Sequence, residues 1–225
     1  MSAVQPSAVR GLERWAGLAA VAYVVLFIGG GTLGYNGQPD TDSAPAKIIA
    51  YYSKASHRDK ISWGWILVLI AVFFLIWFIG GLRQTLNRID PGGNLTAVAT
   101  VGGAVYAALT LAGVSVNAGI KTMSDDTFHH QVYPSLIHAA DDTGYVLHSA
   151  GGVGAAALII ATTVAIRRVG LIPTWAAVVS IIIGVLAIVS IFFYPQILIA
   201  LWLLVAGIVL FRVASAAARA TPPAI

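Results

Sequence analysis

Six long apolar runs constrain the fold of this 225-residue chain more than any other feature of its sequence. A helix needs about 20 mostly apolar residues to cross the hydrocarbon core of a bilayer, where its backbone groups must be hydrogen-bonded within the helix. The runs therefore predict an all-α, polytopic membrane bundle that forms a single transmembrane domain over residues 1–225. The six predicted spans are approximately residues 15–33, 63–82, 95–118, 144–166, 171–193 and 195–213.

The residue composition agrees with a membrane location and excludes several kinds of site. Hydrophobic residues make up 58% of the chain and charged residues only 10%, whereas a typical soluble domain has about 25% charged residues. The chain has no cysteine, which excludes disulfides, thiolate metal ligands and a cysteine nucleophile. No basic cluster alternates with aromatic residues, so we expect no nucleic-acid partner.

Lysine and arginine residues near the ends of the spans predict the orientation of the chain in the cytoplasmic membrane. If both termini are cytoplasmic, eight basic residues lie on the inner side: Arg10, Arg14, Arg83, Arg88, Arg167, Arg168, Arg212 and Arg219. Five lie on the outer side: Lys47, Lys54, Arg58, Lys60 and Lys121. The inner excess favours cytoplasmic N- and C-termini and two long outer loops, residues 35–62 and 119–143.

The first outer loop has the pattern of a short amphipathic helix. Asp42 or Ser43 can cap a helix that tolerates an early Pro45. Apolar residues then recur on one side and charged residues on the other: Ile48, Ile49, Tyr52 and Ala55 against Lys47, Lys54, Arg58 and Asp59. Such a helix would lie in the headgroup layer. A solvated loop without a helix is the alternative.

Small residues in the third and fourth spans predict close contacts between helices, because they let two backbones approach. These residues are Gly102, Gly103, Ala107, Gly151, Gly152, Gly154, Ala155 and Ala156.

Residues 125–148 hold four of the five histidines and four of the nine acidic residues. If a helix starts near Pro134, then His138, Asp141 or Asp142, Tyr145 and His148 recur every three or four residues and share one side of it. A carboxylate can orient a histidine and raise its basicity, which suits acid–base chemistry at a membrane boundary. The candidate catalytic residues are Asp142, Tyr145 and His148, and the candidate substrate-binding residues are Tyr106, Asn117 and Asp141. Alternatively, His148 bonds Asn117 or Tyr106 of the third span and fixes helix register.

The same stretch offers ligands for a divalent metal ion, the one cofactor that the sequence suggests. Imidazole and carboxylate groups suit zinc or iron. The candidate ligands are His129, His130 and His138, accompanied by Asp125, Asp126, Asp141 or Asp142. Their spacing matches no familiar ligand motif, and a solvated polar loop without a metal is the alternative.

Three segments carry a resemblance to a known group of proteins. They are SAPAKIIAYYSKASHRDKISW before the second span, FFLIWFIGGLRQTL at its end, and ADDTGYVLHSAGG at the entry to the fourth span. In these segments the chain resembles the uncharacterised six-span integral membrane proteins common in actinobacteria. The resemblance implies a six-span fold and carries no activity or site residue. The histidine-rich segment DDTFHHQVYPSLIH is a candidate for a specialisation of this chain.

Three functional hypotheses follow from these patterns. The first is a membrane-embedded enzyme that acts on a lipid- or isoprenoid-like substrate by Asp/His acid–base chemistry at the extracytoplasmic side. The second is a non-catalytic accessory or scaffold protein, and the third is a small transporter. The expected partners are the lipid bilayer and, for the enzyme, a lipophilic small molecule. The sequence leaves open whether the chain is an enzyme and whether it forms an oligomer.

Overall fold

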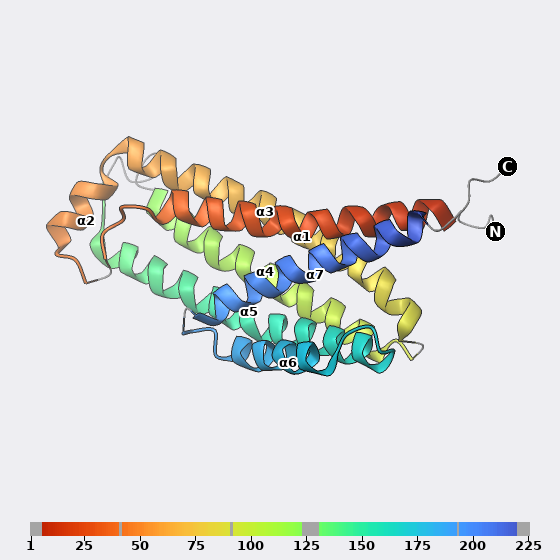
Figure 1. Cartoon of the computed structure of the whole chain (residues 1–225). Coiled ribbons are helices and arrows are strands. Elements are labelled where there is room, and N and C mark those ends of the chain that lie inside the picture. Colours follow the sequence, from red (N-terminus) through yellow and green to blue (C-terminus); the bar gives the residue numbers. More distant parts are fainter. Residues whose placement is uncertain (1–5, 41, 91, 123–130, 193, 220–225) are drawn as a thin grey trace.

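The computed structural model describes residues 6–40, 42–90, 92–122, 131–192 and 194–219. These residues form seven α-helices and no strand, so the predicted all-α class is confirmed for the described chain. The helices are α1 (Pro6–Tyr35), α2 (Pro45–Tyr52), α3 (Ala55–Ile89), α4 (Asn94–Thr122), α5 (Pro134–Arg168), α6 (Thr174–Ile188) and α7 (Tyr194–Arg219) (Figure 1).

Five of the described helices are long and apolar enough to cross a membrane. Their candidate spans are Trp15–Tyr35, Ala55–Ile89, Asn94–Thr122, Pro134–Arg168 and Pro195–Arg212. The chain is therefore a multi-pass helical protein that associates with a lipid bilayer. The helix in the fifth apolar run, α6, has only 15 residues, a rise of about 22 Å against a hydrocarbon core of about 30 Å.

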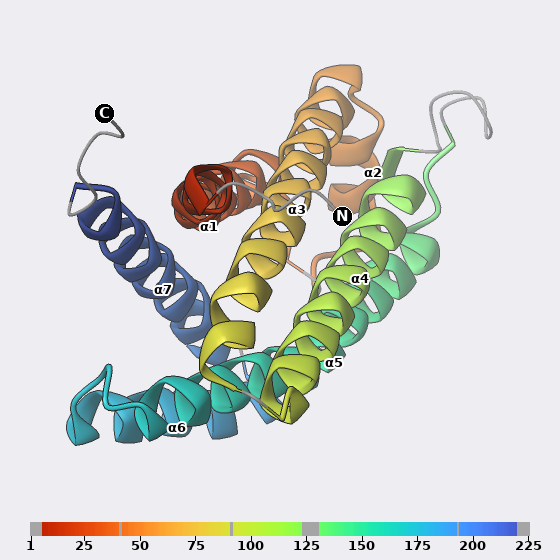
Figure 2. The ribbon, with the colours of Figure 1, turned by 90° about the vertical axis from the view of Figure 1, so that its right-hand side faces the viewer.

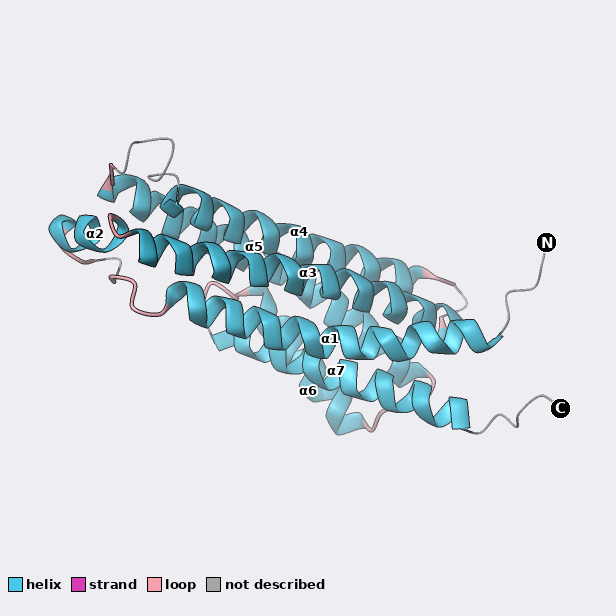
Figure 3. Cartoon of the chain, turned by 90° about the horizontal axis from the view of Figure 1, so that it is seen from above, coloured by secondary structure: helices cyan, strands magenta, loops and turns pink. Residues whose placement is uncertain are grey.

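The long helices α1, α3, α4 and α5 run side by side, with α7 packed on α1 and α6 on α5 (Figures 1 and 2). The first turn of α1 and the last turn of α7 lie at one end of the bundle (Figure 3). The opposite end carries α2 and is built by the end of α1, the start of α3, the end of α4 and the start of α5 (Figure 1). We call this opposite end the α2 end.

Glycines bring neighbouring helices into backbone contact, as the sequence predicts for the third and fourth spans. A Cβ atom on Gly102 of α4 would lie 2.6 Å from the carbonyl oxygen of Gly154 on α5. Gly113 and Gly144 oppose each other nearer the α2 end of the same pair, where a Cβ on Gly144 would lie 2.7 Å from the Gly113 oxygen. This close approach fixes which faces of α4 and α5 meet.

The segment between α1 and α3, predicted as the first outer loop, contains a short helix, α2, whose apolar residues pack on the protein. Ile48 and Tyr52 are buried and join a small cluster with Ile61, Ala118 and Ile137. The helix ends at Tyr52 and a new one begins at Ala55. Arg58 therefore belongs to α3, where its side chain is buried and donates from Nη1 to the Tyr52 carbonyl oxygen at 2.9 Å.

Candidate functional site

A buried lysine lies at the α2 end of the bundle. Lys121 is in the last turn of α4, and its side chain is 0% exposed. Its ammonium donates to Asp141 Oδ1 at 2.6 Å and to Gln38 Oε1 at 2.5 Å. The rings of Tyr35 and Tyr52 lie 5.3 and 5.7 Å from Nζ, within the range of a cation–π interaction. The charge thus has a carboxylate, an amide oxygen and two aromatic faces around it.

The carboxylate of Asp141 ties this lysine to a second residue of α4. Asn117 Nδ2 donates to the same oxygen, Asp141 Oδ1, at 2.8 Å. Asn117 and Lys121 are four residues apart, so both project from one face of α4. That face meets α5 because Gly113 and Gly144 let the two backbones approach here. Asn117 and Asp141 are both candidate substrate-binding residues from the sequence, and the structure joins them by this hydrogen bond.

Two residues from the segment between α1 and α3 complete the arrangement. The hydroxyl of Tyr52 donates to Gln38 Oε1 at 2.9 Å, and Gln38 Nε2 donates to the Gly34 carbonyl at 2.6 Å. Burial, and then the charge of Asp141, raise the pKa of Tyr52 well above its usual value, which keeps the phenol a donor. We call Gln38, Tyr52, Asn117, Lys121 and Asp141 the Lys121 network. It joins α1, α2, α4 and α5.

A second polar group lies deeper in the bundle, around His148 of α5. The imidazole stacks on Phe27 of α1, with ring centres 5.7 Å apart, and lies 6.4 Å from the ring of Tyr106 on α4. Gln196, in the first turn of α7, lies beside it. Tyr106 in turn shares a 3.0 Å hydrogen bond with Tyr23 of α1. Four helices thus contribute to the surroundings of this histidine.

Several buried polar atoms around His148 make no hydrogen bond of ordinary geometry within the described residues. Nδ1 of His148 and the side-chain amide of Gln196 lie beside each other in this condition. The hydroxyl of Thr110, one turn along α4 from Tyr106 and beside it, is a further case. Leaving such a group buried and unpaired costs about 1–3 kcal/mol. Buried polar groups are normally satisfied, so these atoms mark a position suited to water or to the polar group of a ligand.

The three predicted catalytic residues have separate surroundings. Asp142 is exposed, and its carboxylate has no hydrogen bond or ion pair in the described part of the chain. The Tyr145 hydroxyl donates to the carbonyl oxygen of Ile191, in the turn between α6 and α7. On a helix, the six residues from Asp142 to His148 correspond to about 240° of rotation, whereas the seven from Asp141 come close to two full turns. Asp141 and His148 are therefore the pair that shares the α4-facing side.

The predicted metal ligands are only partly within the described structure. His129 and His130 lie outside the described residues, and His138 is half-buried in the first turns of α5. No group of three or more histidine, cysteine, aspartate or glutamate residues suited to a metal occurs in the ranges that the structure describes. The metal site remains a prediction.

Comparison with protein-family models, with curated proteins and with solved structures finds no match for this chain.

Proposed function

We propose that the chain crosses the cytoplasmic membrane six times, with both termini in the cytoplasm. The distribution of lysine and arginine supports this orientation. The position of the first turn of α1 and the last turn of α7 at one end of the bundle supports an even number of crossings (Figure 3). In this arrangement α6 crosses a locally thinned part of the bilayer, and α2 lies at the outer headgroup layer.

Labelling of single cysteines tests this topology cleanly, because the natural chain has none. We expect an impermeant maleimide to modify S53C in intact cells. N87C and R212C should react only after lysis, since they lie at the other end of the bundle; all three positions are exposed. Labelling of R212C in intact cells would show an odd number of crossings and refute the six-span proposal.

We further propose that the protein is a membrane-embedded enzyme, with His148 as its acid–base group, acting on a lipid- or isoprenoid-like molecule from the outer side. One observation carries this proposal: Nδ1 of His148 and the amide of Gln196 lie beside each other among apolar helices, and neither makes a hydrogen bond of ordinary geometry within the described residues. A substrate's polar group would satisfy both, and an imidazole at this depth can donate or accept a proton. The proposal does not depend on the exposed Asp142.

Lipid analysis of cells tests the enzymatic proposal. Extracts from a strain lacking the protein would be compared by mass spectrometry with extracts after expression of the wild type, H148N, Q196A or D142N. We expect one lipophilic species to be consumed or formed with the wild type and D142N, and this change to be lost with H148N and reduced with Q196A. An unaltered product with H148N would overturn the proposal, provided that the variant is present in the membrane at wild-type level.

A non-catalytic accessory or scaffold role is the second candidate, and one observation favours it. Each donor atom of the Lys121 network makes a hydrogen bond within the protein, which supports an α2 end that is held together without a ligand. For this role H148N should retain function. Replacing Gly152, whose Cβ would collide with Ser190 and the Ala187 carbonyl, should abolish it through misassembly. H148N separates the two roles, because misassembly at Gly152 would abolish either one.

A further inference from the structure

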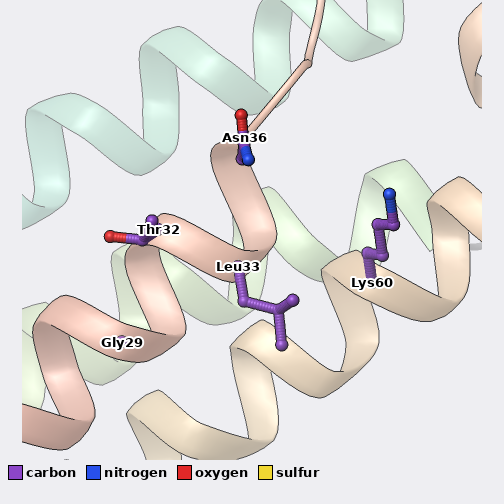
Figure 4. A pocket seen from close by; sticks show the side chains of 5 residues that line it. All are labelled: Gly29, Thr32, Leu33, Asn36 and Lys60. Atoms are coloured by element: carbon purple, nitrogen blue, oxygen red, sulfur yellow. The ribbon is translucent and has the colours of Figure 1, made fainter.

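An exposed groove runs between α1 and α3 near the α2 end. It has a volume of about 420 Å³ and is lined by Gly29, Thr32, Leu33, Asn36 and Lys60 (Figure 4). Gly29, Thr32 and Leu33 lie on one side of α1, because they recur every three or four residues, and Asn36 directly follows the helix. Lys60 comes from the second turn of α3. We call this feature the Gly29 groove.

The groove forms because Gly29 and Gly30, which are adjacent in α1, have different surroundings. Gly30 packs against Gly64 of α3, where a Cβ atom on Gly30 would lie 2.7 Å from the Gly64 carbonyl oxygen. Gly34 contacts the same glycine one turn later. Gly29 lies beside this contact, and nothing lies within 4 Å of the place where its Cβ would be. The groove is therefore a backbone-lined depression that faces outward.

The chemistry of the groove changes along its length. Gly29 and Leu33 give an apolar floor, whereas Asn36 and Lys60 supply an amide and a cation at the other end (Figure 4). Lys60 is exposed and has no ion pair with any described residue. An unpaired ammonium above an apolar channel complements a molecule with an anionic head and a hydrocarbon tail.

Aromatic residues place the polar end of the groove at the level of lipid headgroups. Trp63 follows Lys60 by one helical turn and is 62% exposed, and Tyr35 precedes Asn36 and is 53% exposed. Tryptophan and tyrosine are enriched at the boundary between hydrocarbon and headgroups. A lysine at this level attracts anionic lipid, whereas a zwitterionic lipid offers it no net charge.

We propose that the Gly29 groove binds one anionic phospholipid. Lys60 and the Asn36 side-chain amide bind its phosphate, and one acyl chain lies over Gly29 against Leu33. This site is distinct from the His148 surroundings and requires only that the protein lie in a bilayer.

Native mass spectrometry of the full-length protein tests the site, with phosphatidylglycerol and phosphatidylcholine as the two probes. We expect the wild type to retain one phosphatidylglycerol with about five-fold preference over phosphatidylcholine, the effect of one lysine charge at a membrane surface. K60Q should lose this preference. G29L should lose the bound lipid altogether, because the leucine side chain would occupy the groove without displacing other parts of the protein.

Two matched variants control for unspecific effects. Lys54 is also exposed near the start of α3, so K54Q should keep the preference. Gly31 also has nothing within 4 Å of its Cβ position but does not line the groove, so G31L should keep the lipid. Equal retention of the two lipids by the wild type, or undiminished phosphatidylglycerol retention by K60Q or G29L, would overturn the proposal. Free inorganic phosphate at the same concentration should not displace the lipid, since the acyl chain contributes to binding.

Discussion

The ammonium of Lys121 lies 2.6 Å from Oδ1 of Asp141, and the lysine side chain is closed off from solvent. Removing a charge from water costs several kcal/mol, which close ion pairing and further hydrogen bonds must offset. Here Asn117 of α4 and Gln38, in the segment between α1 and α2, supply those hydrogen bonds. The ion pair can persist only while the end of α4 and the start of α5 stay packed together. Its contribution to stability therefore depends on the contact between these two helices.

Neutralising one member of this pair should be more damaging than neutralising both. D141N leaves a buried, uncompensated ammonium, and we expect a loss of about 3 kcal/mol in the free energy of unfolding. The double variant K121M/D141N also removes the lysine charge that D141N leaves uncompensated, so it should recover most of that loss. Thermal unfolding in detergent measures both, with K47M as a control because Lys47 is exposed on α2. If the loss in the double variant equals the sum of the losses in K121M and D141N measured singly, the two side chains do not form a direct ion pair.

Two glycines of α3 should respond oppositely to alanine. A Cβ on Gly64 would lie 2.6 Å from the Gly30 carbonyl oxygen and 2.8 Å from the Gly34 backbone. We therefore expect G64A to push α1 and α3 apart and to cost about 1–3 kcal/mol. Gly80 has nothing within 4 Å of its Cβ position, so G80A should be neutral or stabilise by up to about 1 kcal/mol through helix propensity. Unfolding in the same detergent compares the two, and equal losses would argue against the α1–α3 contact.

Local sequence patterns predicted those features of the fold that depend on residues spaced along a single helix. The helix start near Pro134 is confirmed, and the small residues of the third and fourth apolar runs do mark a close contact. Helix α3 begins at Ala55, eight residues before the apolar run that starts at Trp63. Hydropathy marks the lipid-buried part of a helix, whereas charged residues such as Asp59 can continue it into water. A hydropathy pattern alone therefore places the start of α3 too late.

The residues of the candidate sites meet through contacts between distant parts of the chain, which the spacing of residues in the sequence does not reveal. Lys121 was counted among the outer charges, although its position four residues after Asn117 is a signal that both face one neighbour. Its bond to Gln38 joins residues 83 positions apart, which no local pattern predicts. The choice between Asp141 and Asp142 turned on about 100° of helix rotation, and only the packing of α4 on α5 decides which carboxylate is buried.

The bond between Tyr23 and Tyr106 should couple α1 to α4 within the bundle. Their hydroxyls are 3.0 Å apart and both side chains are buried. We expect Y23F and Y106F each to cost about 1 kcal/mol, the net value of a typical hydrogen bond. The double variant should cost clearly less than their sum, since the second substitution finds the bond already broken. Chemical unfolding of the four proteins completes this cycle, and a coupling energy near zero would mean that the two hydroxyls do not depend on each other.

Gln38 should control the stability of the segment between α1 and α3, because a single oxygen, Oε1, accepts hydrogen bonds from both Lys121 and Tyr52. Q38A removes both bonds together, which at about 1 kcal/mol each should raise local opening by roughly ten-fold or more. Hydrogen exchange followed by mass spectrometry should show this acceleration in α2, with α6 and the middle of α3 unchanged. N87A changes an exposed residue at the other end of α3 and should leave α2 as in the wild type. Unaltered exchange of α2 in Q38A would mean that the packing of Ile48 and Tyr52 suffices to hold this helix, and that the Lys121 network only shields its own charge.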